Sequence, residues 1–440
     1  MVKMKAIMAL RLQNSYNRSS NSILYIITIF LNYCKIMNIL LLCRYNPYIE
    51  NGASANRYRG LIDGLVAQGH HVALAILGGL KQKKEVEKAK SISNAPEFIY
   101  VSKSNYYSYI QCRLNIYLFD ETIKPLVVRK RLRKLLQNNY DIIWLTQSDL
   151  ILNLFCKVAK HIKSKTLIEL NEFNDIYKGE GATSNFLQRR KGERENELFL
   201  KTVKQVDLFA VMTETLIEHY SKMAKAEAEF MLLPMTVDLS RFNKVFNEKI
   251  TYHRPYIAFT GTMNNHKDGV DVLIRSFAKV ANKYPSIHLY LAGFWHKDVP
   301  MQEKLIDEFG LKERVHYLGT LNREQIPPFV CNASVLALSR PDSHQAQGGF
   351  PTKLGEYLAT GNPVCVTKVG EIPKYLQDDI SAFMAEPGDV DSFADALDRV
   401  LGNEENAQRV GANGRRVAEV NFDADLQAKR LSEFLMENLK

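Results

Sequence analysis

A glycine turn followed by a short, well-punctuated helix offers the clearest chemistry in this sequence. The segment begins at Gly348 and reads GGFPTKLGEYLATGNPV. Pro351 suits the first turn of a helix, because its missing N–H needs no partner there, and Gly361 suits the left-handed residue that ends one. Lys353 and Glu356 lie three residues apart, so both side chains project from one face near the helix start.

These features predict a site for a nucleotide sugar. The free N–H groups of the helix start, the glycines before it and the Lys353 ammonium can together bind an anion such as phosphate. The Glu356 carboxylate lies one turn further along and can accept hydrogen bonds from two sugar hydroxyls. A capped surface helix with an ion pair between Lys353 and Glu356 is the alternative interpretation.

A second glycine loop lies upstream of this helix. The apolar run from Tyr256 to Phe259 predicts a strand that leads into Gly261, and apolar residues at helical spacing predict a helix behind the loop. Those residues are Val270, Leu273, Ile274, Phe277, Ala281 and Tyr284. Open α/β sheets bind ligands at strand–loop–helix junctions of this kind. The sequence therefore predicts a ligand-binding junction at this second glycine loop as well.

Taken in order, these motifs resemble the donor domain of the family-4 retaining glycosyltransferases, which have the GT-B fold. The resemblance is strongest from about Pro234 to Phe422. Further matching segments are Leu233–Phe242, Tyr290–Gly293, Val315–Gly319 and Glu386–Asp389. The resemblance implies an α/β architecture of two Rossmann-like, doubly wound domains facing each other across a cleft. It also implies transfer of a sugar from a nucleotide-sugar donor with retention of anomeric configuration.

The resemblance implies that positive charge contacts the donor phosphate. Lys267 falls where the family keeps a phosphate-contacting lysine. The family commonly has an arginine two residues after the glycine of this strand. In this sequence the glycine is Gly261, and the residues after it, Thr262 and Met263, include no arginine. We expect Arg340 or Lys353 to supply the second charge.

The donor motif of the family has two glutamates eight positions apart, and only the second is present. Glu356 matches it, and the resemblance implies that it holds the ribose hydroxyls. The first position falls on Gly348, so the carboxylate that lies near the transferred sugar in the family is absent. Gly348 and Gly349 can still present backbone N–H groups to the sugar or the phosphate. The nearby Gln345 and Gln347 amides could read sugar hydroxyls.

Two loops of the N-terminal half are expected on the acceptor side. Gly52 and Ser54 match a glycine-rich loop of the family that lies against the donor phosphate or the acceptor. Asn171 and Glu172 follow a predicted strand, where the family often has a histidine and then an acid. Glu172 could hydrogen-bond the acceptor hydroxyl or the sugar, and an ordinary loop acid is the alternative.

No cofactor is expected. The mechanism that the resemblance implies needs neither a protein nucleophile nor a metal, and no DxD-type motif stands out as a metal site. The six cysteines are scattered without metal-ligand spacing. Cys43 and Cys365 lie at the ends of apolar, strand-like runs. The pattern indicates reduced cysteines of a cytoplasmic protein.

The strands and helices alternate along both halves, which predicts two domains with parallel sheets. Residues 1–36 are expected to be an N-terminal extension outside the fold, with Met37 as the favoured initiator and a weak membrane anchor as the alternative. We expect an acceptor domain over 37–245 and a donor domain over 254–420. A final helix, 421–440, is expected to pack back on the first domain.

The formal net charge of +10 suggests an anionic partner. Basic clusters at 129–134 and 189–194 lie in the N-terminal half, and the first could form an amphipathic helix on anionic lipid. Nucleic acid is not expected, because no binding module is recognised. We expect a protein of the cytoplasm or of the inner face of the plasma membrane, acting on a glycan or lipid-linked glycan in cell-surface polysaccharide synthesis. A non-catalytic nucleotide-sugar-binding subunit and an epimerase are the alternatives.

Overall fold

A computed structural model describes most of the second half of the chain and the strands of the first half. The described residues are 36–43, 46–49, 52–76, 96–100, 135, 138–146, 163–174, 193, 196–197, 199–243 and 252–439. Residues 1–35 of the expected extension, the basic cluster at 129–134 and nearly all of the one at 189–194 lie outside these ranges. The membrane contact predicted from those clusters therefore stays a prediction.

The first half of the chain builds a parallel sheet of seven described strands in the order β3-β2-β1-β4-β5-β6-β7. The strands are β1 Asn38–Cys43, β2 His71–Ile76, β3 Glu97–Tyr100, β4 Ile142–Thr146, β5 Lys165–Leu170, β6 Leu208–Val211 and β7 Glu229–Leu232. Most of them are largely apolar runs, as expected for a parallel sheet covered on both faces, although β5 carries the buried Glu169.

The second half builds a six-stranded parallel sheet in the order β10-β9-β8-β11-β12-β13. The strands are β8 Tyr256–Thr262, β9 His288–Phe294, β10 Val315–Gly319, β11 Val335–Leu338, β12 Val364–Thr367 and β13 Phe383–Ala385. The prediction missed β13, because three residues are too few to show a strand period. The prediction of two doubly wound parallel sheets is confirmed.

Helices cover the sheets and carry several of the functional candidates, among them Lys267, Lys353 and Glu356. The described helices are α3 Ala53–Ala67, α9 Glu214–Ser221, the 3₁₀ turn η2 Leu239–Phe242, α10 Asn265–Asp268, α11 Val270–Ala281, α12 Val299–Glu308, α13 Ile326–Cys331, α14 His344–Gly348, α15 Thr352–Thr360, α16 Ile372–Tyr375, α17 Val390–Gly402, α18 Glu404–Asn421 and α19 Ala424–Glu437.

Helix α15 ends as the sequence predicts and begins one residue later. Gly361 closes it in the left-handed conformation with φ 78°, and Pro351 is the capping residue before the first turn. The helix is held to the sheet by Tyr357, whose hydroxyl oxygen accepts a 2.7 Å hydrogen bond from the Thr260 N–H of β8. This bond places the first turn of α15 beside the carboxyl end of β8.

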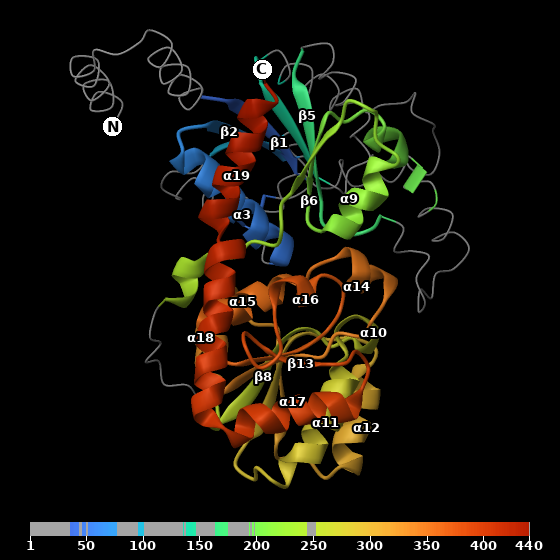
Figure 1. Cartoon of the computed structure of the whole chain (residues 1–440), viewed down its shortest axis with the longest axis vertical. Coiled ribbons are helices and arrows are strands. Elements are labelled where there is room, and N and C mark those ends of the chain that lie inside the picture. Colours follow the sequence, from blue (N-terminus) through green and yellow to red (C-terminus); the bar gives the residue numbers. More distant parts are fainter. Residues whose placement is uncertain are drawn as a thin grey trace, which may run out of the picture.

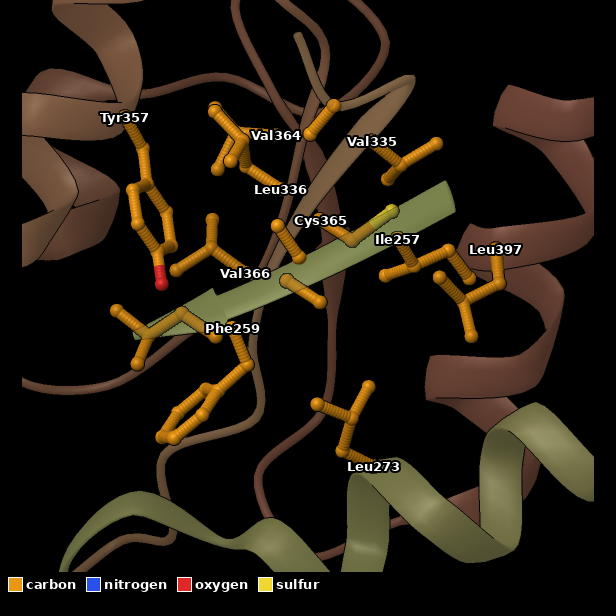
Figure 2. Close-up of a cluster of buried hydrophobic side chains, with 14 of the residues drawn as sticks. Ile257, Phe259, Leu273, Val335, Leu336, Tyr357, Val364, Cys365, Val366 and Leu397 are labelled. Atoms are coloured by element: carbon orange, nitrogen blue, oxygen red, sulfur yellow. The ribbon is translucent and has the colours of Figure 1, made fainter. Parts of the chain in front are cut away.

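A continuous apolar core fixes β8 in the middle of the second sheet. Figure 2 shows Ile257 and Phe259 of β8 surrounded by side chains from β11, β12 and the helices, including Leu273 of α11 and Leu397 of α17. Cys365 of β12 lies in this core with a free thiol. Because the core fills both faces of the sheet, a ligand can bind only at the carboxyl edge of the sheet.

The last helix returns to the first domain. Figure 1 shows α18 running beside the second domain and α19 lying against α3 of the first. Gly60 and Gly64 of α3 allow this approach, since a Cβ on Gly60 would lie 2.8 Å from the Cβ of Ala424, and Gly64 faces Ala428 in the same way. The glycines let the two helix backbones pack closely.

A buried ion pair ties three elements of the first domain together. Arg57 of α3 pairs with Glu169 of β5, and both side chains are almost fully buried, at 1% and 0% exposure. The Arg57 guanidinium also donates to the backbone oxygens of Leu233, at 2.8 Å, and Pro234, which follow β7. Since a buried charge is costly without partners, this network is expected to be a main determinant of the stability of the first domain.

Three stacked histidines lie at the opposite end of the second sheet from the carboxyl edge. The ring centroids of His253 and His288 are 4.7 Å apart, and those of His288 and His316 are 5.2 Å apart. Nδ1 of His288 lies 3.0 Å from Nε2 of His316, as in a hydrogen bond between neutral rings. Burial lowers the pKa of His288, and His316, His253 and Arg314 lower it further.

We expect the second domain to lose stability on acidification through this histidine stack. Burial, followed by His253, also lowers the pKa of His316, although Glu313 opposes this. The unfolded chain therefore binds more protons than the folded one as the pH falls below the ordinary histidine pKa of about 6.5, so the free energy of unfolding decreases there. Urea unfolding of the wild type and of His316→Asn near neutral pH and near about pH 5.5 tests this. An equal pH response in both proteins would contradict it.

Candidate active site

The ammonium of Lys353 forms a buried ion pair at the carboxyl end of β8. Lys353, in the first turn of α15, donates from Nζ to Oδ1 of Asp268 at 2.7 Å. The side chain of Lys353 is 17% exposed and that of Asp268 only 5%. Nζ also lies 4.9 Å from the centroid of the Phe259 ring. The ammonium is thus fixed over the strand end. It does not pair with Glu356, so the alternative interpretation of a surface ion pair between Lys353 and Glu356 is wrong.

Gly261 makes room for this ammonium. A Cβ at Gly261 would overlap Nζ of Lys353, and the φ of Gly261 is 158°, which side-chain-bearing residues rarely adopt. The other oxygen of Asp268, Oδ2, accepts a 3.2 Å hydrogen bond from the N–H of Thr262. The predicted donor residues Gly261, Thr262 and Lys353 therefore meet at one point, around a carboxylate that the sequence reasoning did not single out.

Arg340 brings a second buried cation to the same edge. It follows β11 and is 6% exposed. Nη2 makes a long contact of 3.5 Å with the backbone oxygen of Gln345, and Nε has no hydrogen-bond partner within the described part of the chain. Burial lowers the pKa of the guanidinium, while Asp268 and Glu172 oppose the shift. A buried guanidinium with an unused donor is suited to an anionic ligand, since unpaired buried donors are costly.

Glu356 lies one turn along α15 and pairs with an arginine from the end of the first domain. Its carboxylate accepts from Nη1 of Arg241 at 3.3 Å, and Arg241 also donates to the backbone oxygen of Arg323 at 2.7 Å. The Glu356 side chain is 20% exposed. Burial raises the pKa of Glu356, and Arg241 opposes the rise. Arg241 therefore holds the Glu356 carboxylate in a position where it can accept a hydrogen bond from a ligand hydroxyl.

Lys267 lies next to these groups but is exposed. It belongs to the short helix α10, where its backbone N–H donates to the side chain of Asn264 at 2.9 Å. Its charge lowers the pKa of Lys353, so the two ammonium groups lie near each other. Contact of Lys267 with a donor phosphate stays a prediction.

Gly348 is covered by the ring of Phe173 from the first domain. A Cβ at Gly348 would overlap that ring, which stacks on His344 with centroids 4.3 Å apart. The backbone oxygen of Gly348 accepts a 2.9 Å hydrogen bond from the Thr213 hydroxyl of the first domain. The absence of a carboxylate at position 348 thus has a steric reason, because this packing leaves no space for a side chain.

The predicted acceptor-side residues divide into two groups. Asn171 and Glu172 contact the donor segment directly, since Nε2 of Gln345 donates to Glu172 at 2.9 Å and Gly349 lies beside the Asn171 backbone oxygen. Gly52 and Ser54 are exposed at the start of α3 and lie away from this contact. Their helix approaches the Glu356 side instead.

Helix α3 contacts the residues around Glu356 through Asn56. Its side-chain oxygen accepts a 3.0 Å hydrogen bond from Nε of Arg323. Arg323 in turn adjoins Arg241, whose guanidinium pairs with Glu356. The candidate residues therefore lie along the line where the two domains meet.

A further contact between the domains involves Glu371, which sequence reasoning missed. Its Oε1 accepts hydrogen bonds from the N–H groups of Glu214, at 2.6 Å, and Thr215, at 3.2 Å. These are first-turn donors of α9, so a residue of the second domain caps a helix of the first. Lys374 bridges the carboxylates of Glu214 and Glu371. The contact holds Thr213 and Gly348 in register.

The residues that sequence reasoning missed had weak local signals. Asp268 stands inside the singled-out loop, next to Lys267, but its partner Lys353 is 85 residues further on. Arg241 lies in a segment noted only for its resemblance, and Glu356 is 115 residues away. The sequence could have indicated Asp268 as a carboxylate within a glycine loop, but it could not have predicted the pairing of Asp268 with Lys353.

Two general features of the described residues bear on partners. No three His, Cys, Asp or Glu side chains of the described ranges converge as a metal site requires. Among the helices that the structure describes, none is long and apolar enough to span a bilayer.

The part of the chain that carries this site is similar to known glycosyltransferases. The family model described as Glycosyl transferases group 1 matches residues 254–403, which contain Gly261, Asp268, Arg340, Lys353 and Glu356. The chain is 25% identical over 224 residues to an MMP alpha-(1->4)-mannosyltransferase of Mycolicibacterium hassiacum, covering 50% of this chain. That match spans only about half, 52%, of the relative's length.

Two solved structures share the fold across both domains. Sucrose-phosphate synthase from Thermosynechococcus elongatus superposes with a TM-score of 0.67 at 17% identity, covering 91% of this chain and 99% of the other. Anabaena Alr3699/HepE, solved in complex with UDP and glucose, superposes with a TM-score of 0.66 at 14% identity, covering 91% and 100%. The predicted GT-B fold is confirmed.

Proposed function

We propose that the chain transfers a sugar from a nucleotide-sugar donor to a hydroxyl acceptor, since its residues 254–403 match the family model of the glycosyl transferases group 1. The observation that carries this proposal is the arrangement around the start of α15. Two buried cations, Lys353 and Arg340, lie at the carboxyl edge of the sheet, and the carboxylate of Glu356 lies one helical turn away. This spacing suits a diphosphate followed by a ribose.

In the proposed complex, Lys353, Arg340 and the free N–H groups of the α15 start contact the diphosphate. Helix N-termini and buried cations both favour phosphate. Glu356 accepts hydrogen bonds from the ribose hydroxyls, and Arg241 holds the carboxylate in place. Gly349 leaves its backbone close to Arg340, with 3.8 Å between a Cβ built there and Nη2, so the glycine segment can approach the phosphate as well.

The reaction breaks the bond between the anomeric carbon and the phosphate oxygen, and the electron pair stays on that oxygen. The acceptor hydroxyl forms its new bond on the same face of the sugar, and its proton passes to the leaving phosphate. The configuration is therefore retained without a protein nucleophile. The protein lowers the barrier by offering Lys353 and Arg340 to the negative charge that develops on the phosphate.

We further propose that the acceptor is a glycan or a lipid-linked glycan of cell-surface polysaccharide synthesis, reached at the inner face of the plasma membrane. The excess of positive charge supports this assignment, because it favours an anionic membrane surface. Glu172 is the residue of the first domain best placed to hydrogen-bond the acceptor or the sugar, since Gln345 holds it at the donor segment.

A second candidate function has one observation in its favour. The Phe173 ring occupies the space beside Gly348, where the family's first donor-motif carboxylate would project. This feature would also suit a subunit that binds nucleotide sugars without transferring the sugar. Such a protein would bind the donor and leave it intact in the presence of acceptor.

The proposal is tested by measuring unfolding temperature with UDP, GDP and ADP. At about a hundred times Kd, a bound nucleotide stabilises the folded state by about 2.7 kcal/mol, which a thermal scan resolves. We expect one nucleotide to raise the unfolding temperature of the wild type and to have no effect on Glu356→Ala. The matching radiolabelled donors then separate transfer from binding alone. No shift with any nucleotide would remove the basis of the proposal.

A further inference from the structure

We infer that Asp268 is a positioning residue, which holds the ammonium of Lys353 over the end of β8 so that it faces the donor phosphate. This inference rests on the proposed function, because it concerns the same site. No contact between Asp268 and the substrate is required. Its action passes through Lys353.

Asp268 is fixed rigidly enough to position another group. It ends α10, whose first turn is capped by the side chain of Asn264, and it is followed by Gly269 in the left-handed conformation with φ 68°. The backbone oxygen of Gly269 accepts from the Ser339 hydroxyl at 2.7 Å. The carboxylate is held at both oxygens, by Lys353 at 2.7 Å and by the Thr262 N–H at 3.2 Å. At 4% exposure, Asp268 has little contact with solvent.

The surroundings of Lys353 explain why it needs this partner. Asp268 and Lys267 face it from α10, Arg340 from the segment after β11 and Glu356 from its own helix. Burial lowers the pKa of Lys353, and Arg340 and Lys267 lower it further, while Asp268 is the main opposing influence. Removing the Asp268 charge should therefore move the pKa of Lys353 further down, toward the working pH of the protein.

A lysine without its proton cannot neutralise the leaving phosphate. A lysine that keeps its proton but loses Asp268 is free to swing away, because the Phe259 ring is its other described contact. Either change weakens the interaction with a diphosphate. Burial of the Asp268 carboxylate costs desolvation free energy, but the buried carboxylate keeps Lys353 charged and correctly placed.

The test compares the wild type with Asp268→Asn, which keeps the shape and an acceptor for Thr262 but removes the charge. UDP, GDP and ADP are titrated into both proteins between about pH 7 and pH 10, a range that brackets a lowered lysine pKa. We expect the affinity of Asp268→Asn to begin to fall at a lower pH than that of the wild type, by about tenfold for each unit by which the pH exceeds the lowered pKa. The affinity of Lys353→Met should show no such pH dependence over this range.

A second readout does not depend on the nucleotide. Competitive acetylation followed by mass spectrometry reports the reactivity of Lys353 at each pH, with Lys267 as an exposed reference in the same sample. We expect Lys353 to react at lower pH in Asp268→Asn than in the wild type. If that variant does not fold, Asp268→Ser, which also offers an acceptor to Thr262, replaces it with the same expectations.

The outcomes separate the two proposals. Unchanged pH dependence of both nucleotide affinity and Lys353 acetylation in the Asp268 variant would overturn the inference. A loss of thermal stability with an unchanged acetylation profile would assign Asp268 a structural role only. If no nucleotide binds the wild type at any pH, the proposed function fails, and the acetylation profile still decides whether Asp268 controls Lys353.

Discussion

Replacing Lys353 with methionine should lower kcat by about two to three orders of magnitude, with a smaller change in KM. Loss of one preorganised donor at a developing negative charge typically costs this much, equivalent to about 2.7–4 kcal/mol of transition-state stabilisation. Methionine keeps the length and the apolar stem of the side chain, so the packing against Phe259 is largely retained. The ground state carries less charge on the phosphate ester oxygen than the transition state, which is why kcat responds more than KM.

The measurement is a steady-state transfer assay with the donor identified by the nucleotide titration. Arg340→Met should show a loss of the same kind, since its buried guanidinium lies at the same edge. Lys267→Met tests separately the phosphate contact predicted for Lys267, a lysine near the site whose side chain is exposed. An unchanged kcat in Lys353→Met would contradict the prediction for Lys353, whatever the effect of Lys267→Met.

Replacing Arg57 with methionine should destabilise the protein by about 3–5 kcal/mol. Removal of one partner of a buried ion pair leaves the other charge in a low-dielectric environment, and this penalty exceeds the value of the pair itself. Glu169 is fully buried, so water cannot solvate it once Arg57 is gone. The backbone oxygens of Leu233 and Pro234 would lose their donors at the same time.

Urea unfolding at neutral pH measures this loss. Arg57→Met/Glu169→Leu is the informative second variant, because removing both charges should recover a large part of the stability. Lys201→Met removes an exposed i,i+4 pair with Glu197 and should leave the free energy of unfolding nearly unchanged. An Arg57→Met variant as stable as the wild type would mean that Glu169 finds another partner or takes up a proton.

Position 348 departs from the donor motif of the similar glycosyltransferases, while the fold is kept. Phe173 fills the space beside Gly348, and its stacking on His344 joins the two domains at the point where the transferred sugar is expected. Glu172, the neighbour of Phe173, is held by Gln345 in the same contact. Recognition of the sugar in this protein is therefore expected to rely on both domains, rather than on a carboxylate at the start of the donor motif.

The sequence by itself determined the elements and the local chemistry at their ends. The apolar runs of the parallel strands, the helical spacing of α11, and Gly361 as the left-handed end of α15 are encoded within a few residues of chain. The placement of Lys353 and Glu356 on one helical face is local in the same sense. Such features depend on backbone periods of two and 3.6 residues, which a pattern shows directly. Strand β13 was missed because an apolar run of three residues is too short to indicate a strand.

Only the tertiary structure decided which charges pair. From the sequence, Lys353 had Glu356 as its nearest acid, yet it pairs with Asp268 of another loop, and Glu356 pairs with Arg241. The order of the strands decides this. Strand β11 lies between β8 and β12, and Asp268, which follows β8, meets Lys353, which precedes β12. Pairing energies depend on distance and burial across the fold, and neither is a property of local spacing.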